Sequence, residues 1–396
     1  MATSVEVVTT LLTVGGLVYM LLALWGARDF ERHSRRVASM GADGFAPNVT
    51  ILKPLKGVDA QMYAGFVSHC RQQYAGHFEI LFGVSSMEDP AVVQIERLRL
   101  EFPECAIRLI ECPERLGTSG KISNLIQMLR QARYEYVLIN DSDIRVSPDY
   151  LARVMGCFGA GADREDAQVG MVTAPYLGRT AADGKALTLW ARLEALGIST
   201  DFLPGVLTAR KIEGGIRFGL GSTLAVSRTA LTAAGGLEPL VDYLADDYEM
   251  GARIARAGYR IELCGQIVET TVPAYDFRDF CNHQLRWARS TRDSRRWGYL
   301  GLGITYCIPW AVLNCIASGF ALWGFTLFSL VLLARVSVAL SVGVGVLRDG
   351  QVLRDIWLLP LRDFFGLGFW AWSFASGTVV WRGEHFKLKS GKISRA

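Results

Sequence analysis

Two aspartates that stand two residues apart are the first candidates for chemistry. Asp141 and Asp143 come just after the apolar run 136–139, which predicts a buried strand. Because side chains two residues apart in an extended segment point to the same side, both carboxylates can face one cation. Such oxygen ligands suit Mg²⁺ or Mn²⁺, which bind one or two carboxylates together with substrate phosphates. The ordinary alternative is an acidic turn, or a cap for the helix that Pro148 opens.

Two further acidic residues stand where predicted elements begin or end. Asp89 comes after the predicted strand 80–84, where a carboxylate can accept hydrogen bonds from a base or a ribose hydroxyl. Asp247 opens a predicted helix that runs to residue 257. Helix capping explains either residue alone, because a carboxylate stabilises the first turn of a helix. Taken with the Asp141–Asp143 pair, they indicate an active site.

A basic segment adds a cationic candidate. Arg286 and Trp287 are followed by Arg289 and Arg292, and arginines three residues apart form one face of a helix. A guanidinium is suited to hold a leaving diphosphate. The alternative is a basic helix that lies on anionic lipid. Both interpretations can hold, with Arg286 and Trp287 in the site and the later arginines at the lipid.

The elements that must position these residues alternate between strands and helices. The predicted strands are residues 49–52, 80–84, 107–110, 136–139 and 170–174, and the predicted helices are residues 60–74, 91–101, 119–133 and 148–158. This alternation predicts an α/β domain with a mostly parallel sheet covered on both faces. Ligands of such sheets bind beyond the carboxyl ends of the strands, which is where the acidic residues stand.

Composition excludes several classes of protein. The 396 residues are 51% hydrophobic and 20% charged, which excludes a disordered or collagen-like chain. The net charge of +4 is too small to indicate a nucleic-acid partner. The eight cysteines form no CxxC pair and have no zinc-ligand spacing, so we expect neither a disulfide framework nor a zinc site.

Apolar stretches at both ends indicate a membrane protein. Residues 5–25 are long enough to span a bilayer, and they lack the flanks of a cleaved signal peptide. The arginines that follow, at 28, 32, 35 and 36, would keep the next domain in the cytoplasm. Residues 301–346 have the length of two spans. We therefore predict an N-terminal anchor (1–27), a cytoplasmic catalytic domain (28–298) and a C-terminal membrane region with a basic tail (299–396).

Two segments leave alternatives open. Residues 364–381 are apolar, and a fourth span there would put the C-terminus outside, although the basic tail favours the inside. Either this stretch is re-entrant, or the tail departs from the rule. Residues 196–207 are apolar and interrupted by Pro204. They form either a buried, broken helix or an element that dips into the cytoplasmic leaflet to admit the acceptor.

The candidate residues resemble a known signature. The D, D, D, (Q/R)xxRW pattern of membrane-bound family-2-like glycosyltransferases is matched by Asp89, Asp141-Ser142-Asp143, Asp247 and Arg286-Trp287. His283 departs from it, because it stands where Gln or Arg begins the last motif. The segments 52–59, 88–91, 121–125 and 141–146 are more closely similar to ceramide glucosyltransferases, over about residues 48–298. The chain most resembles a bacterial branch of that family that adds N-acetylglucosamine to bacteriohopanetetrol in hopanoid biosynthesis.

The resemblance implies a fold, a reaction and a role for each residue. It implies a Rossmann-like GT-A fold, a UDP-sugar donor, a membrane-lipid acceptor and inversion at the anomeric carbon, in an integral protein of the bacterial inner membrane. Asp247 would be the general base. Asp143 would hold Mg²⁺ or Mn²⁺, with Asp141 beside it. The donor would be bound by Lys53, Pro54, Asp89, Lys121, Asp141, Arg286 and Trp287.

Three other activities compete with this one. A ceramide glucosyltransferase that uses UDP-glucose would share every motif. A processive polysaccharide synthase shares the acidic residues and the Arg–Trp pair but usually has more spans. A polyprenyl-phosphate sugar transferase shares the fold but commonly lacks the Arg–Trp pair. A scaffold without activity would have no use for three acidic sites at the ends of predicted elements.

Overall fold

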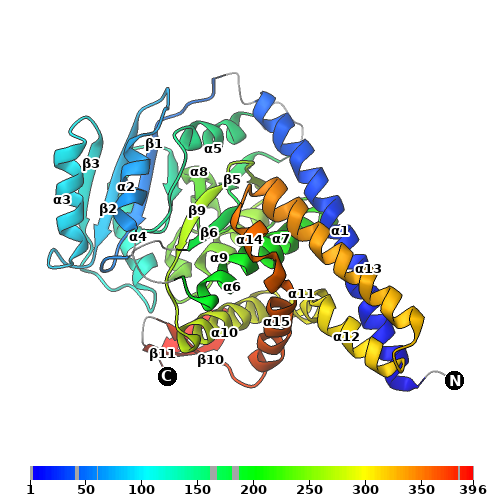
Figure 1. Ribbon diagram of the computed structural model, residues 1–396. Coiled ribbons are helices and arrows are strands. Elements are labelled where there is room, and N and C mark those ends of the chain that lie inside the picture. Colours follow the sequence, from blue (N-terminus) through cyan, green and yellow to red (C-terminus); the bar gives the residue numbers. More distant parts are fainter. Residues whose placement is uncertain are drawn as a thin grey trace.

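The computed structural model describes residues 3–40, 44–59, 61–160, 167–180, 187–381 and 384–395. Figure 1 shows an α/β part from which a helical arm projects. The N-terminus lies at the far end of the arm, and the C-terminus lies under the α/β part.

A seven-stranded sheet in the order β3-β2-β1-β4-β7-β5-β8 forms the centre of the α/β part. Its strands are β1 (Val49–Pro54), β2 (Phe78–Val84), β3 (Ala106–Glu111), β4 (Tyr136–Ile139), β5 (Val169–Thr173), β7 (Leu224–Ser227) and β8 (Arg260–Leu263). Neighbouring strands are parallel, except that β7 runs antiparallel to β4 and β5. The five strands predicted from the sequence are confirmed, and so is the mostly parallel sheet.

Helices bury both faces of the sheet. They are α2 (Met62–Cys70), α3 (Ala91–Glu101), α4 (Gly120–Gln131), α5 (Tyr150–Gly159), α8 (Arg228–Ala233) and α9 (Asp246–Arg256). Successive side chains alternate between two cores: Ile51 of β1 packs in the core with α2, α3 and α5, and Leu52 packs in the core with α4 and α9. This explains why the inner strands are mostly apolar, since neither of their faces meets water, whereas the edge strand β3 is partly exposed.

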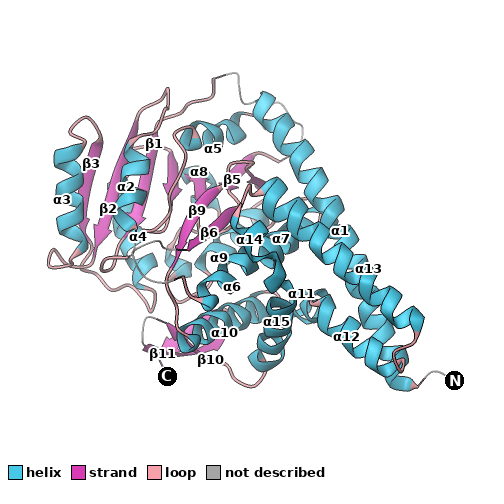
Figure 2. Cartoon of the chain, viewed as in Figure 1, coloured by secondary structure: helices cyan, strands magenta, loops and turns pink. Residues whose placement is uncertain are grey.

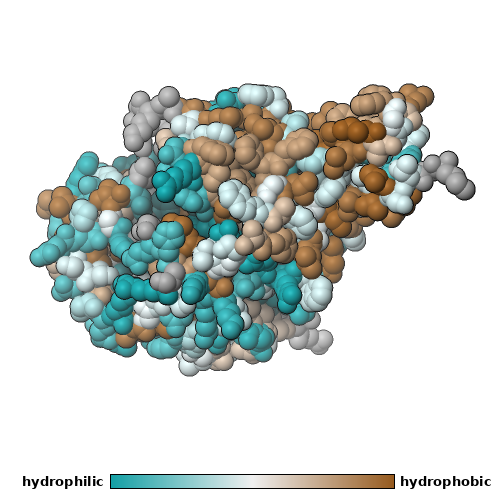
Figure 3. Space-filling view, turned by 90° about the horizontal axis from the view of Figure 1, so that it is seen from below, coloured by the Kyte–Doolittle hydropathy of each residue, from teal (hydrophilic) through white to brown (hydrophobic). Residues whose placement is uncertain are grey.

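The arm consists mainly of three helices that pack side by side. They are α1 (Ser4–Met40), α12 (Cys307–Ala317) and α13 (Leu322–Val338), which continues as a π-helix, η4 (Ala339–Val346). By length and composition, residues 4–39 and 322–346 can each cross a membrane. The bent pair of α11 (Arg296–Thr305) and α12 adds a third span if it counts as one, within the described chain. Figure 3 shows apolar side chains gathered over this arm.

The apolar stretch 364–381 is not one continuous helix. It contains the end of α15 (Leu359–Ser373) and the strand β10 (Thr378–Trp381). β10, β11 (Glu384–Lys389) and β12 (Lys392–Arg395) form an antiparallel sheet beside α10 (Phe277–Ser294), below the α/β part (Figure 2). The basic tail therefore lies with the catalytic part of the molecule, and a fourth span through this stretch is wrong.

The segment 196–207 is a buried helix. It contains the end of α6 (Leu189–Gly197), a π-helical turn η2 (Ile198–Phe202) and the start of α7 (Leu203–Ile212), which packs along α1. Leu203, Val206 and Leu207 share one core with α1, whereas Leu196 and Ile198 are buried in two other clusters. This favours the buried, broken helix over an element that dips into lipid.

Candidate active site

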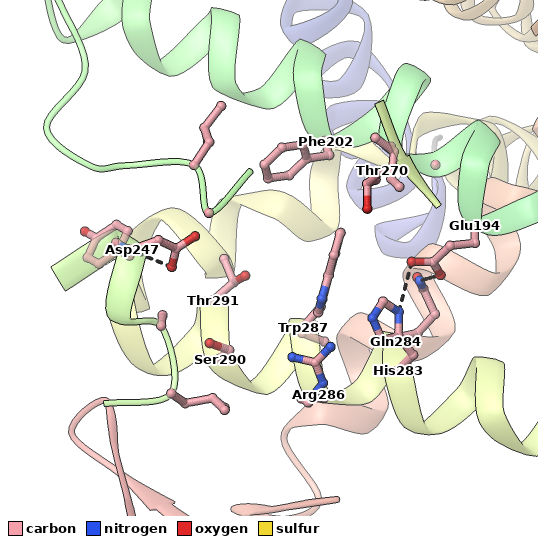
Figure 4. A pocket seen from close by; sticks show the side chains of 18 of the residues that line it. Glu194, Phe202, Asp247, Thr270, His283, Gln284, Arg286, Trp287, Ser290 and Thr291 are labelled. Carbon is pink, nitrogen blue, oxygen red and sulfur yellow. Dashed lines mark hydrogen bonds and ion pairs between the residues drawn. The ribbon is translucent and has the colours of Figure 1, made fainter. Parts of the chain in front are cut away.

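A cavity of about 1830 Å³ opens at the carboxyl ends of the parallel strands. It continues to the membrane helices, where Tyr19 of α1 and Val338 of α13 line it. The predicted site residues that line it are Pro54, Lys121, Asp141, Asp143, Asp247, Arg286 and Trp287. Figure 4 shows Asp247 on one side of this cavity and Arg286 and Trp287, on α10, on the other. Residues about 200 positions apart in the sequence are thus brought to one site.

Lys121 joins two acidic segments at the strand ends. Its Nζ lies 2.8 Å from Asp141 Oδ1 and 3.4 Å from Asp246 Oδ2. Burial lowers the pKa of Lys121, but the two carboxylates outweigh this and raise it above its ordinary value. The ammonium group therefore stays charged and holds the loop after β4 close to the start of α9.

Asp143 is fixed by a small parallel sheet formed by β6 (Tyr176–Thr180) and β9 (Val268–Val272). Asp143 Oδ2 accepts hydrogen bonds from Thr270 Oγ1 (2.5 Å) and from the Thr271 backbone N–H (3.0 Å). Burial raises the pKa of Asp143, and the charge of Asp141 adds to this. A nearby cation would stabilise the ionised form of this carboxylate, which burial and the charge of Asp141 disfavour.

The residues present fit a divalent metal ion that the donor helps to bind. Asp141 and Asp143 offer oxygen ligands on the cavity wall. Within the described ranges, no group of three or more His, Cys, Asp or Glu side chains forms a complete metal cage. Mg²⁺ and Mn²⁺ would therefore take their remaining ligands from substrate phosphates and water.

Lys53 and Asp89 are absent from the described residues that line the cavity. Lys53 is fully buried, its Nζ donates to the Asp141 carbonyl (3.1 Å), and burial lowers its pKa to about 7. Asp89 accepts from the backbone N–H groups of Gly57 (3.1 and 3.0 Å) and Ala91 (2.9 Å). Both residues hold backbone segments next to the cavity. Their direct contact with the donor stays a prediction.

Asp247 has the properties of a general base. It lies in the first turn of α9, and its Oδ1 accepts from the Tyr248 backbone N–H (2.8 Å). Burial and the neighbouring charge of Asp246 raise the pKa of Asp247 to about 6. A Cβ atom at Gly221 would lie 2.9 Å from Asp247 Oδ2, so glycine leaves room for the carboxylate. A base with a pKa near neutrality can take a proton from a hydroxyl.

His283 also lines the cavity, one turn before Arg286. Its ring stacks on Tyr275 (5.5 Å between centroids) and tilts against Trp287 (5.1 Å). Its Nδ1 lies 2.9 Å from Glu194 Oε1, an ion-pair contact drawn in Figure 4. This contact holds α10 against α6, so that His283 and Arg286 face the cavity.

Sequence reasoning missed Glu194, which is fully buried on α6. It contacts His283, and it accepts a hydrogen bond from Gln284 Nε2. Burial alone would raise the pKa of Glu194, but His283 and Arg362 outweigh it and lower the pKa. The available signal was a single acidic residue in a mostly apolar helical run, since an acid is seldom fully buried unless it is paired.

The later arginines of α10 contact the C-terminal segment of the chain. Arg289 Nη1 donates to the Thr378 carbonyl (2.5 Å), and Arg292 donates to the carbonyls of Ser373 and Ser376. The interpretation that these two arginines face lipid is therefore replaced by an internal role.

The comparison with protein families decides the class of the protein. The model of glycosyl transferase family 21 matches residues 8–394 of this chain. The chain belongs to glycosyl transferase family 21. This confirms the predicted enzyme class, a UDP-sugar glycosyltransferase, and the similarity to ceramide glucosyltransferases.

Two relatives of this family 21 chain come from Caenorhabditis elegans. Ceramide glucosyltransferase 1 is 24% identical over 374 residues, which cover 88% of this chain and 73% of the relative. Ceramide glucosyltransferase 3 is 25% identical over 290 residues, which cover 71% and 59%.

A solved structure of similar fold is the mannosyltransferase PcManGT from Pyrobaculum calidifontis, in complex with GDP-Man and Mn²⁺. It aligns with a TM-score of 0.52 and 20% sequence identity, over 94% of the family 21 chain and 97% of its own. This likeness confirms the predicted GT-A-like fold.

Proposed function

We propose that the protein transfers N-acetylglucosamine from UDP-N-acetylglucosamine to a hydroxyl of bacteriohopanetetrol, with inversion at the anomeric carbon. The observation that supports a lipid acceptor is that one continuous cavity joins the acidic strand ends to the membrane helices. The choice of hopanoid and of N-acetylglucosamine follows from the resemblance of the sequence to the bacterial branch of the family.

The lining of the cavity offers both polar groups and apolar side chains. Near α9 it is lined by charged groups, among them Asp247 and Lys121. On the arm it is lined by Met20 and Val338, beside Arg335, whose charge is paired with Asp201 and Asp363. A lipid whose apolar body rests against Met20 and Val338 would present its polar end to Asp247.

The proposed reaction is a single displacement. The acceptor hydroxyl gives its proton to Asp247 while its oxygen attacks the anomeric carbon of the donor. The bond from that carbon to the diphosphate oxygen breaks, and UDP leaves with the electron pair. Arg286 stabilises the charge that develops on the diphosphate, and Trp287 shields it from water. One displacement inverts the configuration, so no nucleophile on the protein is needed.

Asp143, with Asp141 beside it, would hold Mg²⁺ or Mn²⁺. When bound, such an ion neutralises charge on the leaving diphosphate. The oxygen ligands on the cavity wall support this assignment. So does the Mn²⁺ in the structure of PcManGT with GDP-Man.

Glucosylation of ceramide from UDP-glucose is the second candidate. The curated relatives that favour it are ceramide glucosyltransferases. Either acceptor lies in a membrane, which the candidate spans of the chain fit, and the arginines at 28, 32, 35 and 36 favour a cytoplasmic catalytic part at the bacterial inner membrane.

A matrix of donors and acceptors tests the proposal. The purified protein is incubated in detergent micelles with UDP-glucose or UDP-N-acetylglucosamine and with ceramide, diacylglycerol or bacteriohopanetetrol. We expect the highest turnover for UDP-N-acetylglucosamine with bacteriohopanetetrol. Preferred turnover of ceramide with UDP-glucose would replace the hopanoid assignment by the second candidate. Transfer to a free oligosaccharide without any lipid product would contradict both.

A further inference from the structure

The C-terminal strands pair with the loop that leads into the proposed general base. This base loop consists of residues 242–245, directly before Asp246 and Asp247. Ile393 N–H donates to the Asp242 carbonyl (2.7 Å), and Leu244 N–H donates to the Gly391 carbonyl (3.0 Å). Between these two bonds, Tyr243 and Lys392 stand opposite each other as an antiparallel bridge. β12 thus adds a short strand pairing to the base loop.

An apolar cluster seals this contact. Leu244 of the base loop is buried together with Val379, Phe386, Leu388 and Ile393 of the C-terminal strands. Residues about 140 positions apart therefore form one small core. The base loop supplies a single side chain to this core, so its position depends on the strands.

The same strands are fastened to α10 on the opposite side of the cavity. Arg289 donates to the Thr378 carbonyl, and Gly391 N–H donates to Asp293 Oδ2. Gly391 has a φ of 78°, and a Cβ there would come within 3.0 Å of the Tyr243 ring. Glycine is required at this turn because another residue would meet both strain and a close contact.

The strands also form part of the cavity wall. Glu384, His385 and Phe386 line the cavity that Asp247 and Arg286 line. The segment therefore touches the base loop, the helix that carries Arg286 and the space between them.

We propose that the C-terminal strands β10–β12 are a positioning element of the active site. They hold the base loop against α10, so that Asp247 and the Arg286–Trp287 pair keep the separation that transfer needs. The inference rests on the proposed role of Asp247 as the base. Its positioning residues are Leu388, Gly391 and Ile393, which act through the base loop.

Point variants in the full-length enzyme test the proposal. Leu388→Ala on β11 and Ile393→Ala on β12 remove side chains from the cluster, whereas Lys387→Ala and Lys389→Ala alter the exposed face of β11. We expect the first two to lower kcat by about 10- to 100-fold, because catalysis depends steeply on the placement of the base. Affinity for UDP, measured by calorimetry, should stay unchanged in all four. Equal kcat in the cluster and control variants would overturn the proposal.

A variant that keeps the cluster intact guards against a general folding defect. Gly391→Ala should disturb the turn that meets Tyr243 and its backbone contacts with Leu244 and Asp293, while the side chains of the apolar cluster are unchanged. We expect a loss of kcat with UDP affinity retained. Loss of UDP affinity in step with kcat in every variant would assign the strands a merely structural role and overturn the proposal.

A cross-link distinguishes between two behaviours of the C-terminal strands: a fixed brace, or a lid that must open during turnover. Tyr243→Cys combined with Lys392→Cys places two thiols opposite each other in an antiparallel pair, where a disulfide can form. The oxidised enzyme should keep the turnover of the reduced one. Turnover that stops on oxidation and returns on reduction would contradict a brace. Each single variant, oxidised in the same way, controls for the native cysteines.

The outcome can be told apart from a failure of the proposed function. The wild-type product identifies the acceptor, and Asp247→Asn tests the base. Suppose that wild type glycosylates a lipid, Asp247→Asn is impaired, and the strand variants turn over like wild type. The inference about the strands then fails while the proposed function stands. If wild type uses another acceptor, the same variants are compared with that acceptor.

Discussion

At the scale of single residues, Asp246 and Asp247 are adjacent acids with different partners. Asp246 pairs with Lys121 (3.4 Å), whereas Asp247 accepts only from the Tyr248 backbone N–H among the hydrogen bonds of the described chain. We expect Asp247→Asn to bind UDP normally and to lower turnover by about 10²–10⁴, which is the usual contribution of a general base. Asp246→Asn is the matched control. An inactive Asp246→Asn with an active Asp247→Asn would move the base by one residue.

The raised pKa of Asp247 gives a pH-rate prediction. Its carboxylate must be ionised to accept a proton, and burial with the charge of Asp246 raises the pKa to about 6. kcat should therefore be full well above pH 6 and fall as the pH drops through that value. Asp246→Asn removes the negative charge that helps to raise the pKa of Asp247. The acidic limb of the pH-rate profile should therefore move to lower pH in this variant. A limb that stays in place in this variant would show that another group titrates.

Removal of the metal ion tests Asp141 and Asp143. We expect EDTA to abolish transfer and added Mg²⁺ or Mn²⁺ to restore it. Asp143→Ala should weaken binding of the UDP-sugar only when the metal is present, since its carboxylate is proposed to act through the ion. Full activity in chelator would leave Arg286 and neighbouring cations as the groups that neutralise the diphosphate.

At the scale of elements, the sequence predicts what depends on local pattern. The strands β1, β2, β4 and β5 are mostly apolar runs because both faces of the sheet are buried there, and the motif residues stand at the ends of β1, β2 and β4. β6 and β9 mix polar with apolar residues, so neither has a clear pattern. The contacts of Glu194 with α10 and of β12 with the base loop join distant segments, which no local pattern shows.

The contact between α6 and α10 gives a prediction at this scale. Glu194 is buried and contacts both His283 and Gln284, so it fixes the helix that carries Arg286. Glu194→Gln should destabilise the protein by about 3 kcal/mol, because removing one partner of a buried pair leaves the other uncompensated. It should also raise KM for the donor. Thermal unfolding and donor kinetics measure the two effects.

A control for Glu194 is available on the surface. Glu96 of α3 pairs with Arg99 and is about half exposed, with a side-chain accessibility of 51%. Glu96→Gln should leave both stability and donor kinetics unchanged, since exposed pairs contribute little. Equal stability of the two variants would show that the Glu194 contacts do not hold α10.

At the scale of the whole molecule, the arm and the catalytic part share one hydrophobic core. Met20 and Ala27 of α1 belong to the same buried cluster as Leu52 of β1 and Val338 of α13. The membrane segment is therefore part of the folded catalytic unit and more than a tether. This continuity is what lets one cavity reach from the strand ends to the arm.

The position of the two ends of the chain gives a topology prediction. The turn at residues 318–321, between α12 and α13, lies with the N-terminus at the far end of the arm, and the C-terminal strands lie beside α10 (Figure 1). An odd number of spans satisfies this arrangement, with α1, the bent pair α11–α12 and α13 crossing the membrane. The turn and the tail should then face opposite sides.

Cysteine labelling in oriented membrane vesicles checks this topology. Phe320 and Lys389 are both exposed, so a cysteine at either position can be reached by a maleimide that does not cross membranes. Phe320→Cys should react from the periplasmic side and Lys389→Cys from the cytoplasmic side. Wild type provides the background from the native cysteines. If both variants react from the same side, α13 does not cross the membrane between them. Because the base loop and β12 share backbone hydrogen bonds and lie on one side, the bent pair α11–α12 would then not cross either, and the three-span topology would be wrong.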